Sequence, residues 1–320
     1  MIAELSELSH YATIALAIGT TAIGVGLGEG IASYAALDAM DIQPSARSDI
    51  AHASIVGMAL IETSAIIGIT VAIILLLDTQ SAAKTIYTGI AELGIAFSIC
   101  FSGFALGLVS AMPARQAVYA IARQPFFNQK IFTFMILTQS IIQTPIVFGF
   151  IIAMFIKGQA ATASSLAESI RLIASGLCVG IGSIGPAIGL AHFAQTACKS
   201  IGYNRHAYNK LLSFTFISEA IIETPLIFCL IISLLLLSFN VPDNNMLTAY
   251  AMLASAFCMG FGTLGAGIGS GKTAAAACEQ LAVNPAHYTM LSRLSLFAQG
   301  LIDTNVIYAL LISLLLLIYR

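Results

Sequence analysis

The sequence predicts an all-α membrane protein made of four tandem helical hairpins, which together supply eight transmembrane helices. Hydrophobic residues make up 58% of the 320 residues and charged residues only 9%, whereas soluble domains carry about a quarter charged residues. The chain also repeats itself, because a polar residue followed by threonine interrupts an apolar run at Glu62, Gln143, Glu223 and Asp303. This spacing of about 80 residues indicates four copies of one unit.

Each unit contains two apolar stretches, and about 20 helical residues are enough to cross the ~30 Å hydrocarbon layer. We expect one hairpin in each of residues 1–80, 81–161, 162–241 and 242–320. The expected helices span residues 8–41 and 49–77, 84–122 and 130–156, 165–200 and 208–238, and 246–281 and 288–318. Because most of them exceed the minimum length, they are expected to tilt or to extend beyond the bilayer.

The first helix of each unit is rich in glycine, and the second is rich in leucine, isoleucine and phenylalanine. Small residues four positions apart let two helix backbones approach closely within a membrane. Gly28, Gly189 and Gly269 each precede the carboxylate of their unit by 34 residues, so the glycines keep a constant register with it. The candidate packing glycines are Gly24, Gly26, Gly28, Gly185, Gly189, Gly265, Gly267 and Gly269.

Ionisable residues are costly within lipid, so their repetition in register predicts a function. Burial disfavours the charged form of a carboxylate. Glu62, Glu223 and Asp303 can therefore cross lipid when a proton or another cation neutralises them. Gln143 cannot titrate, so the second unit has lost its ion site and three carriers remain in four hairpins.

The basic residues predict the orientation of the chain. Nine of the 13 Lys and Arg residues lie within the hairpins near their loops, and four lie near the connections and the C-terminus: Lys84, Lys157, Arg171 and Arg320. Cytoplasmic segments of membrane proteins carry an excess of basic residues. The hairpin loops are therefore expected in the cytoplasm, and both termini on the opposite side of the membrane.

A glycine-rich helix, a polar loop and a second helix with one mid-membrane carboxylate resemble the c subunit of rotary ATPases, which is their rotor-ring proteolipid. The loop of unit two reads Ala122-Arg123-Gln124-Pro125, which is similar to the F-type loop that contacts the central stalk, and Gln43-Pro44 retains part of it. Fusion of several hairpins in one chain is instead similar to V-type and archaeal rotor subunits. The branch of the family stays open.

This resemblance implies that copies of the chain form a closed ring in an energy-coupling membrane. The ring would carry H⁺ or Na⁺ past a stator a-type subunit, which supplies an arginine, and would turn the central-stalk subunits. It implies no cofactor, no nucleic-acid partner and no bond chemistry within this chain.

The resemblance also suggests ion ligands. Glu29, 33 residues before Glu62, stands where Na⁺-type rotor subunits carry a polar ligand, and its equivalents are Ser110, Leu190 and Ser270. Thr63, Thr224 and Thr304 follow their carboxylates directly, as in Na⁺-type subunits. Together Glu29 and Thr63 slightly favour Na⁺ over H⁺.

Three further residues are candidate ligands. Tyr308 matches the family position of a tyrosine that often hydrogen-bonds the carboxylate, and Glu219 lies one helical turn before Glu223 on the same face. Thr144 persists in the unit that lacks a carboxylate. It either serves the carboxylate of a neighbouring unit or simply reflects common descent.

Other functions fit the sequence less well. The segment Ala266–Thr273 is similar to a phosphate-binding loop, but that motif needs a preceding strand, so no nucleotide site is expected. A secondary transporter or a pore built from parallel hairpin repeats is the alternative function. Secondary transporters usually surround one central site with broken helices, whereas these carboxylates recur once in three of the units.

Overall fold

The computed structural model describes residues 2–78, 85–239, 241 and 245–319, and every regular element within them is helical. Lys84, Arg320 and the expected boundary at residues 80 and 81 lie outside the described residues. Eight spans in the described ranges are long and apolar enough to cross a membrane. This confirms the predicted all-α fold with eight transmembrane helices.

The helices pair into four hairpins, and a short 3₁₀ turn forms each hairpin loop. The elements in chain order are α1 (Ile2–Ile42), α2 (Arg47–Leu76), α3 (Ile86–Val109), α4 (Ala111–Arg123), α5 (Asn128–Ile142), α6 (Thr144–Ala160), α7 (Leu166–Tyr203), α8 (Tyr208–Ser238), α9 (Met246–Val283) and α10 (Tyr288–Ile318).

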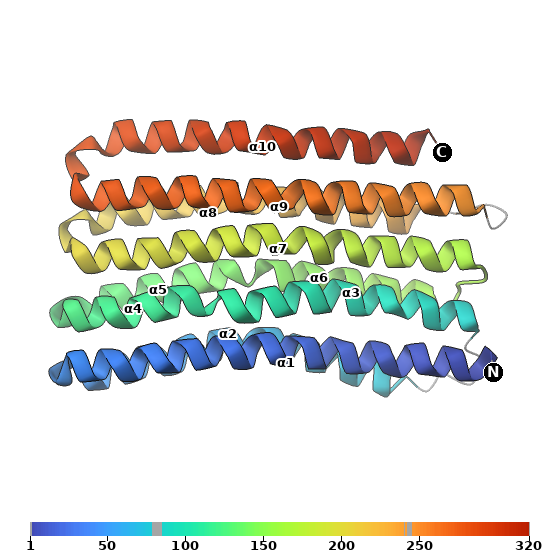
Figure 1. The fold of residues 1–320 in the computed structure, drawn as a ribbon, viewed down its shortest axis with the longest axis horizontal. Coiled ribbons are helices and arrows are strands. Elements are labelled where there is room, and N and C mark those ends of the chain that lie inside the picture. Colours follow the sequence, from blue (N-terminus) through green and yellow to red (C-terminus); the bar gives the residue numbers. More distant parts are fainter. Residues whose placement is uncertain (1, 79–84, 240, 242–244, 320) are drawn as a thin grey trace.

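The hairpins stand side by side with their helices nearly parallel (Figure 1). One row contains α1, the pair α3 and α4, α7 and α9, and the second helices of the first three hairpins lie behind it (Figure 1). α10 stands beside α9 at the edge. The hairpin loops gather at one end and both termini lie at the other, as Figure 1 shows. Below, the first row is called the inner row and the second helices the outer row.

Glycines bring the inner-row backbones into contact. A Cβ atom at Gly28 of α1 would overlap the carbonyl oxygen of Gly107 in α3, and one at Gly189 of α7 would overlap that of Gly267 in α9. Gly24 meets the backbone of Phe104 in the same way. Side chains at these positions would force the helices apart.

The other candidate glycines differ in their surroundings. Gly185 lies against the backbone of Leu264, and Gly269 approaches the side chain of Ile302 in its own hairpin. Gly26 on α1 and Gly265 on α9 face open space. These two belong to the first and last hairpins, which carry the least buried spans of the described chain.

Two helices are interrupted where the sequence predicted continuous ones. The break between α3 and α4 lies at Ser110, and the break between α5 and α6 lies at Gln143. Pro113 and Pro145 follow them, and a proline supplies no N–H to the carbonyl four residues earlier. Pro225 nevertheless lies inside the continuous helix α8. Proline alone therefore does not explain the breaks, which face each other across unit two.

We expect Gly189→Ala to destabilise the chain by about 1–3 kcal/mol, because the added methyl group would overpack the contact between α7 and α9. Gly300→Ala is the matched control, since Gly300 is exposed on α10 and an added methyl group there would have no atom within 4 Å. Thermal unfolding in detergent measures both variants. Equal stability of the two would contradict this account of the inner row.

Candidate ion-binding site

The repeated polar residues lie at one depth in the outer row. Glu62, Gln143, Glu223 and Asp303 each lie 15 residues after the first residue of an outer-row helix, namely Arg47, Asn128, Tyr208 and Tyr288. At 1.5 Å per residue this is about 22 Å from the loop end. Because the complete outer-row helices α2, α8 and α10 have 30 or 31 residues, the carboxylates lie at their midpoints.

Glu223 of unit three lies beside the preceding hairpin. Its carboxylate interacts with the hydroxyl group of Thr144, which begins α6 in unit two. The same hydroxyl donates to the backbone carbonyl of Ile141 at 2.8 Å. Thr144 therefore lies beside the carboxylate of a neighbouring unit.

Asp303 of unit four takes its partner from the inner row. The hydroxyl group of Ser270 in α9 donates to its Oδ1 atom at 3.4 Å. Thr224 in the preceding hairpin donates to the carbonyl of Ala220 at 3.0 Å, and Thr304 donates to that of Leu301 at 2.6 Å. The side chain of Tyr308 is exposed on α10.

Unit two fills the equivalent place with an amide. The Nε2 atom of Gln143 donates to the carbonyl oxygen of Leu60 at 3.0 Å and to the hydroxyl oxygen of Ser110 at 3.3 Å. Ser64 donates to its Oε1 atom at 3.5 Å. Gln143 is buried. Its amide thus joins α2 of unit one to both broken helices of unit two without any bound ion.

Of the four repeated polar residues, the one in unit one is the most exposed. Glu62 is exposed on α2, and it interacts electrostatically with Glu29 of α1, which is partly buried. Thr63 donates to the carbonyl oxygen of Leu60, the same oxygen that Gln143 uses. Two carboxylates therefore share this site, and a cation between them would reduce their repulsion.

A second polar position was missed by sequence reasoning. One helical turn before each repeated polar residue stand Met58, Gln139, Glu219 and Gln299. The last three are fully buried. The constant spacing of these three residues could have revealed the position from the sequence, although only Glu219 was predicted as a candidate ligand. Both carboxylate oxygens of Glu219 lack a hydrogen-bond partner among the residues that the structure describes.

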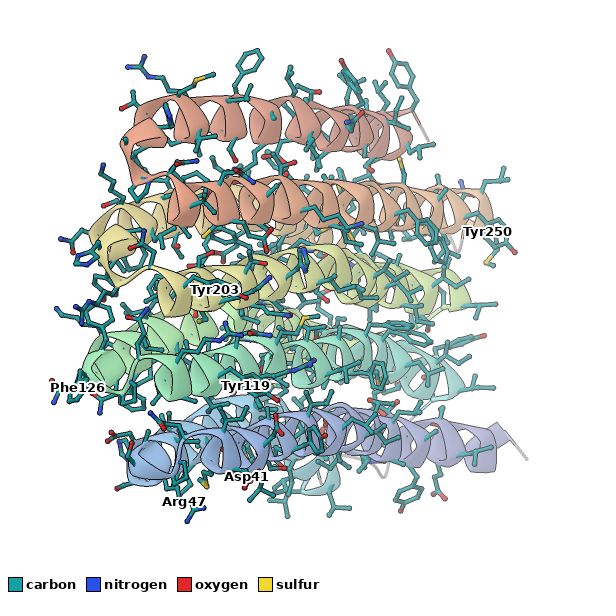
Figure 2. All side chains as sticks on the ribbon, turned by 60° about the vertical axis from the view of Figure 1, so that its left-hand side comes forward. Asp41, Arg47, Tyr119, Phe126, Tyr203 and Tyr250 are labelled. Carbon is teal, nitrogen blue, oxygen red and sulfur yellow. The ribbon has the colours of Figure 1, made fainter. Side chains whose placement is uncertain are left out.

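The hairpin loops link neighbouring units. The Nε2 atom of Gln124 donates to the carbonyl of Gly202 at 2.8 Å, and the guanidinium group of Arg123 lies 4.6 Å from the ring centre of Tyr203. Phe126, next to Pro125, is 98% exposed and projects from the loop end (Figure 2). Gln43 and Pro44 occupy the loop of unit one at the same end.

The segment that resembles a phosphate-binding loop, Ala266–Thr273, lies within the continuous helix α9. The strand and turn that such a motif requires are replaced there by membrane-length helix. Within the described residues, no group of three or more His, Cys, Asp or Glu side chains is placed to hold a metal ion.

The repeat matches a known family. The model of the family described as the ATP synthase C subunit matches residues 12–75, 93–156, 173–236 and 253–316. The ATP synthase c subunit of Chloroflexus aurantiacus is 36% identical over 69 residues, which are 22% of this chain and 91% of that protein. The ATP synthase c subunit of Campylobacter curvus is 38% identical over 88 residues, 28% of this chain and 87% of that protein. The second ATP synthase c subunit of Cereibacter sphaeroides is 42% identical over 69 residues, 22% of this chain and 83% of that protein.

Each of these relatives aligns with little more than a quarter of the chain at most, as expected for a fused array. The four segments matched by the family model are one hairpin each and together cover most of the 320 residues. This chain is therefore an integral membrane protein that belongs to the ATP synthase C subunit family.

Proposed function

We propose that the chain is an ion-carrying subunit of the rotor ring in a rotary ATPase or ATP synthase. The observation that carries this proposal is the equal depth of Glu62, Glu223 and Asp303 at the midpoints of outer-row helices. Carboxylates at this depth load a proton or Na⁺, cross the lipid in neutral form, and release the ion at the stator. The chain couples ion flow to rotation and breaks no bonds itself.

Closure into a ring would explain the two open edges. Each hairpin packs against the next in one direction, so the exposed side of the fourth hairpin fits the first hairpin of another copy. Gly265 of α9 and Gly26 of α1 face open space at these edges, and glycine faces are what join the inner-row helices elsewhere. Repetition of one contact closes a ring when the rotation per copy divides a full turn.

The site of unit one is then shared between copies. Glu223 interacts with Thr144 of the preceding hairpin. The preceding hairpin of Glu62 is the fourth hairpin of another copy, so Thr304 of the partner subunit would take the place of Thr144. Tyr308 of the partner subunit lies one turn further along the same helix. On this proposal, Glu62 is exposed in the single chain because half of its site comes from the preceding copy.

The choice between H⁺ and Na⁺ depends on the other ligands. A proton needs one carboxyl group, whereas Na⁺ needs several oxygens. Glu29 provides extra carboxylate oxygens beside Glu62, which favours Na⁺ at that site. Ser270 provides one such oxygen for Asp303.

The loop end would face the cytoplasm and the central stalk, with both termini across the membrane. Arg123, Gln124 and Pro125 in unit two, and Gln43 and Pro44 in unit one, would contact the stalk subunits. A stator a-type subunit would pass along the outer row, where the carboxylates lie.

We expect a carbodiimide to label Glu62, Glu223 and Asp303 and to stop rotary ATPase activity. Mass spectrometry locates the label, and Na⁺ slows labelling if Na⁺ is the ion but has no effect if it is H⁺. Continued ATP-driven ion transport after full labelling would contradict the carrier role of these carboxylates, whereas ion flux that needs no ATP would favour a pore or a secondary transporter.

Where Na⁺ is the transported ion, Thr144→Val should weaken its binding at Glu223 by roughly threefold to tenfold, because the variant removes an oxygen ligand and one such polar contact contributes about 0.5–1.5 kcal/mol. Thr133→Val in the same unit is the matched control, since its exposed hydroxyl group bonds only its own helix at Gln129. The ion concentration that halves carbodiimide labelling of Glu223 measures both. Similar values for the two variants would show that Thr144 is not a ligand.

Gln143→Glu should add a fourth carrier and raise the number of ions moved per ATP in proportion, from three carriers to four in each chain. Gln143→Leu provides the control, because it removes the amide without adding a charge. Ion transport and ATP hydrolysis measured together in vesicles give the ratio. An unchanged number of ions per ATP in Gln143→Glu would show that this number does not follow the number of mid-membrane carboxylates.

A further inference from the structure

A second polar layer lies one helical turn nearer the loops than the ion-carrying residues, at about 6 Å along the helix axis. We use this name for Gln139 of α5, Glu219 of α8 and Gln299 of α10, which stand four residues before Gln143, Glu223 and Asp303. All three are 0% exposed. In unit one the same position holds Met58, so a polar group there is not needed for the hairpin to form.

The two glutamines show which interaction this layer uses. The Nε2 atom of Gln139 donates to the carbonyl of Ser110 at 2.9 Å, and to that of Gly57 in the preceding hairpin at 3.3 Å. The Nε2 atom of Gln299 donates to the hydroxyl oxygen of Ser295 at 3.1 Å, and to that of Ser218 in the preceding hairpin at 3.5 Å. In both, a hydrogen-bond donor crosses the boundary between hairpins.

A glutamate can donate a hydrogen bond across this boundary only when it carries a proton. An ionised carboxylate has acceptors alone, whereas the protonated acid has one O–H donor. The carbonyls that Gln139 uses belong to Gly57 and Ser110. The repeat places the carbonyls of Thr138 and Leu190 at the equivalent positions around Glu219. These carbonyls are the acceptors that a protonated Glu219 would find.

Within the part of the chain that the structure describes, no positively charged side chain interacts with Glu219 to balance an ionised form. Neither of its carboxylate oxygens has a hydrogen-bond partner among residues 2–78, 85–239, 241 and 245–319, and the side chain is completely buried. Among the described residues, its titratable neighbours are Glu223 on α8, Cys198 on α7 and Cys278 on α9. All three become negative when they ionise, so none can neutralise a carboxylate. An isolated charge of this kind is too costly to keep in a low-dielectric interior.

We propose that Glu219 holds a proton that stays on the protein throughout the ion cycle, as the carboxylic-acid counterpart of Gln139 and Gln299. Glu223 alone then carries the transported ion of unit three. Glu219 adds no fourth carrier to replace the one lost at Gln143. This role, which rests on the proposed rotor function, differs from the additional ion ligand that the sequence suggested for Glu219.

The test compares Glu219→Gln with Glu223→Gln in the intact assembled protein. Infrared spectroscopy follows the carbonyl stretch of protonated carboxyl groups as the pH is raised. We expect the native protein to keep one such band at alkaline pH, Glu219→Gln to lose it, and Glu223→Gln to retain it. Glu219→Gln should also leave carbodiimide labelling of Glu223 and the number of ions per ATP unchanged. The reciprocal variant Gln299→Glu should add a second persistent band.

Several results would overturn this proposal. They are the lack of a persistent band in the native protein, a fall in ions per ATP in Glu219→Gln from four carriers to three, and loss of Glu223 labelling in that variant. Failure of Glu219→Gln to assemble would also count against it, because the same amide is accepted at Gln139 and Gln299. Failure of the rotor function is recognised separately, by full ATP-driven ion transport in Glu223→Gln.

Discussion

Hydrocarbon offers no hydrogen-bond partners, so every polar side chain at the midpoint of these helices must find one within the protein or carry its own neutralising ion. The four units meet this constraint differently. Gln143 meets it with the side chains of Ser64 and Ser110 and the backbone of Leu60, whereas Asp303 has one hydroxyl group. The fewer partners the protein supplies, the more a carboxylate depends on a cation. The same fold can therefore hold both permanently satisfied and ion-dependent positions.

Helix separation decides whether such partners can meet. Ser and Thr hydroxyl groups lie close to their own backbone, so they reach a neighbouring hairpin only when the helices are tightly packed. Gly28 against Gly107, and Gly189 against Gly267, hold the inner row at this short separation. At the boundary of units two and three, where Thr144 lies beside Glu223, the corresponding close contact is that of Gly176 with the carbonyl oxygen of Gly94.

The sequence was sufficient for the eight spans, the four repeats and the common depth of the carboxylates, because these follow from hydropathy and period alone. It was not sufficient for the helix breaks at Ser110 and Gln143. Pro145 and Pro225 occupy equivalent positions in their units, yet only the first accompanies a break. At the break, Gln143 bonds Leu60 of unit one and Ser110 of its own unit, and no local pattern contains these contacts. Gln139 and Gln299 were overlooked for the same reason, since an isolated amide in an apolar run gains meaning only from the hairpin opposite.

Unit two has therefore changed in more than one residue. Its amide closes the boundary with unit one through two hydrogen bonds that need no ion, one to Leu60 and one from Ser64, and a third joins it to Ser110 of its own unit. On the proposed function, three carriers moving across 100 mV exchange about 7 kcal/mol per chain, against about 9 kcal/mol for four. A ring with fewer charges per turn works against a larger potential for the same ATP. The substitution at Gln143 thus favours ATP-driven pumping, while its hydrogen bonds preserve the packing that the lost ion site would otherwise have supplied.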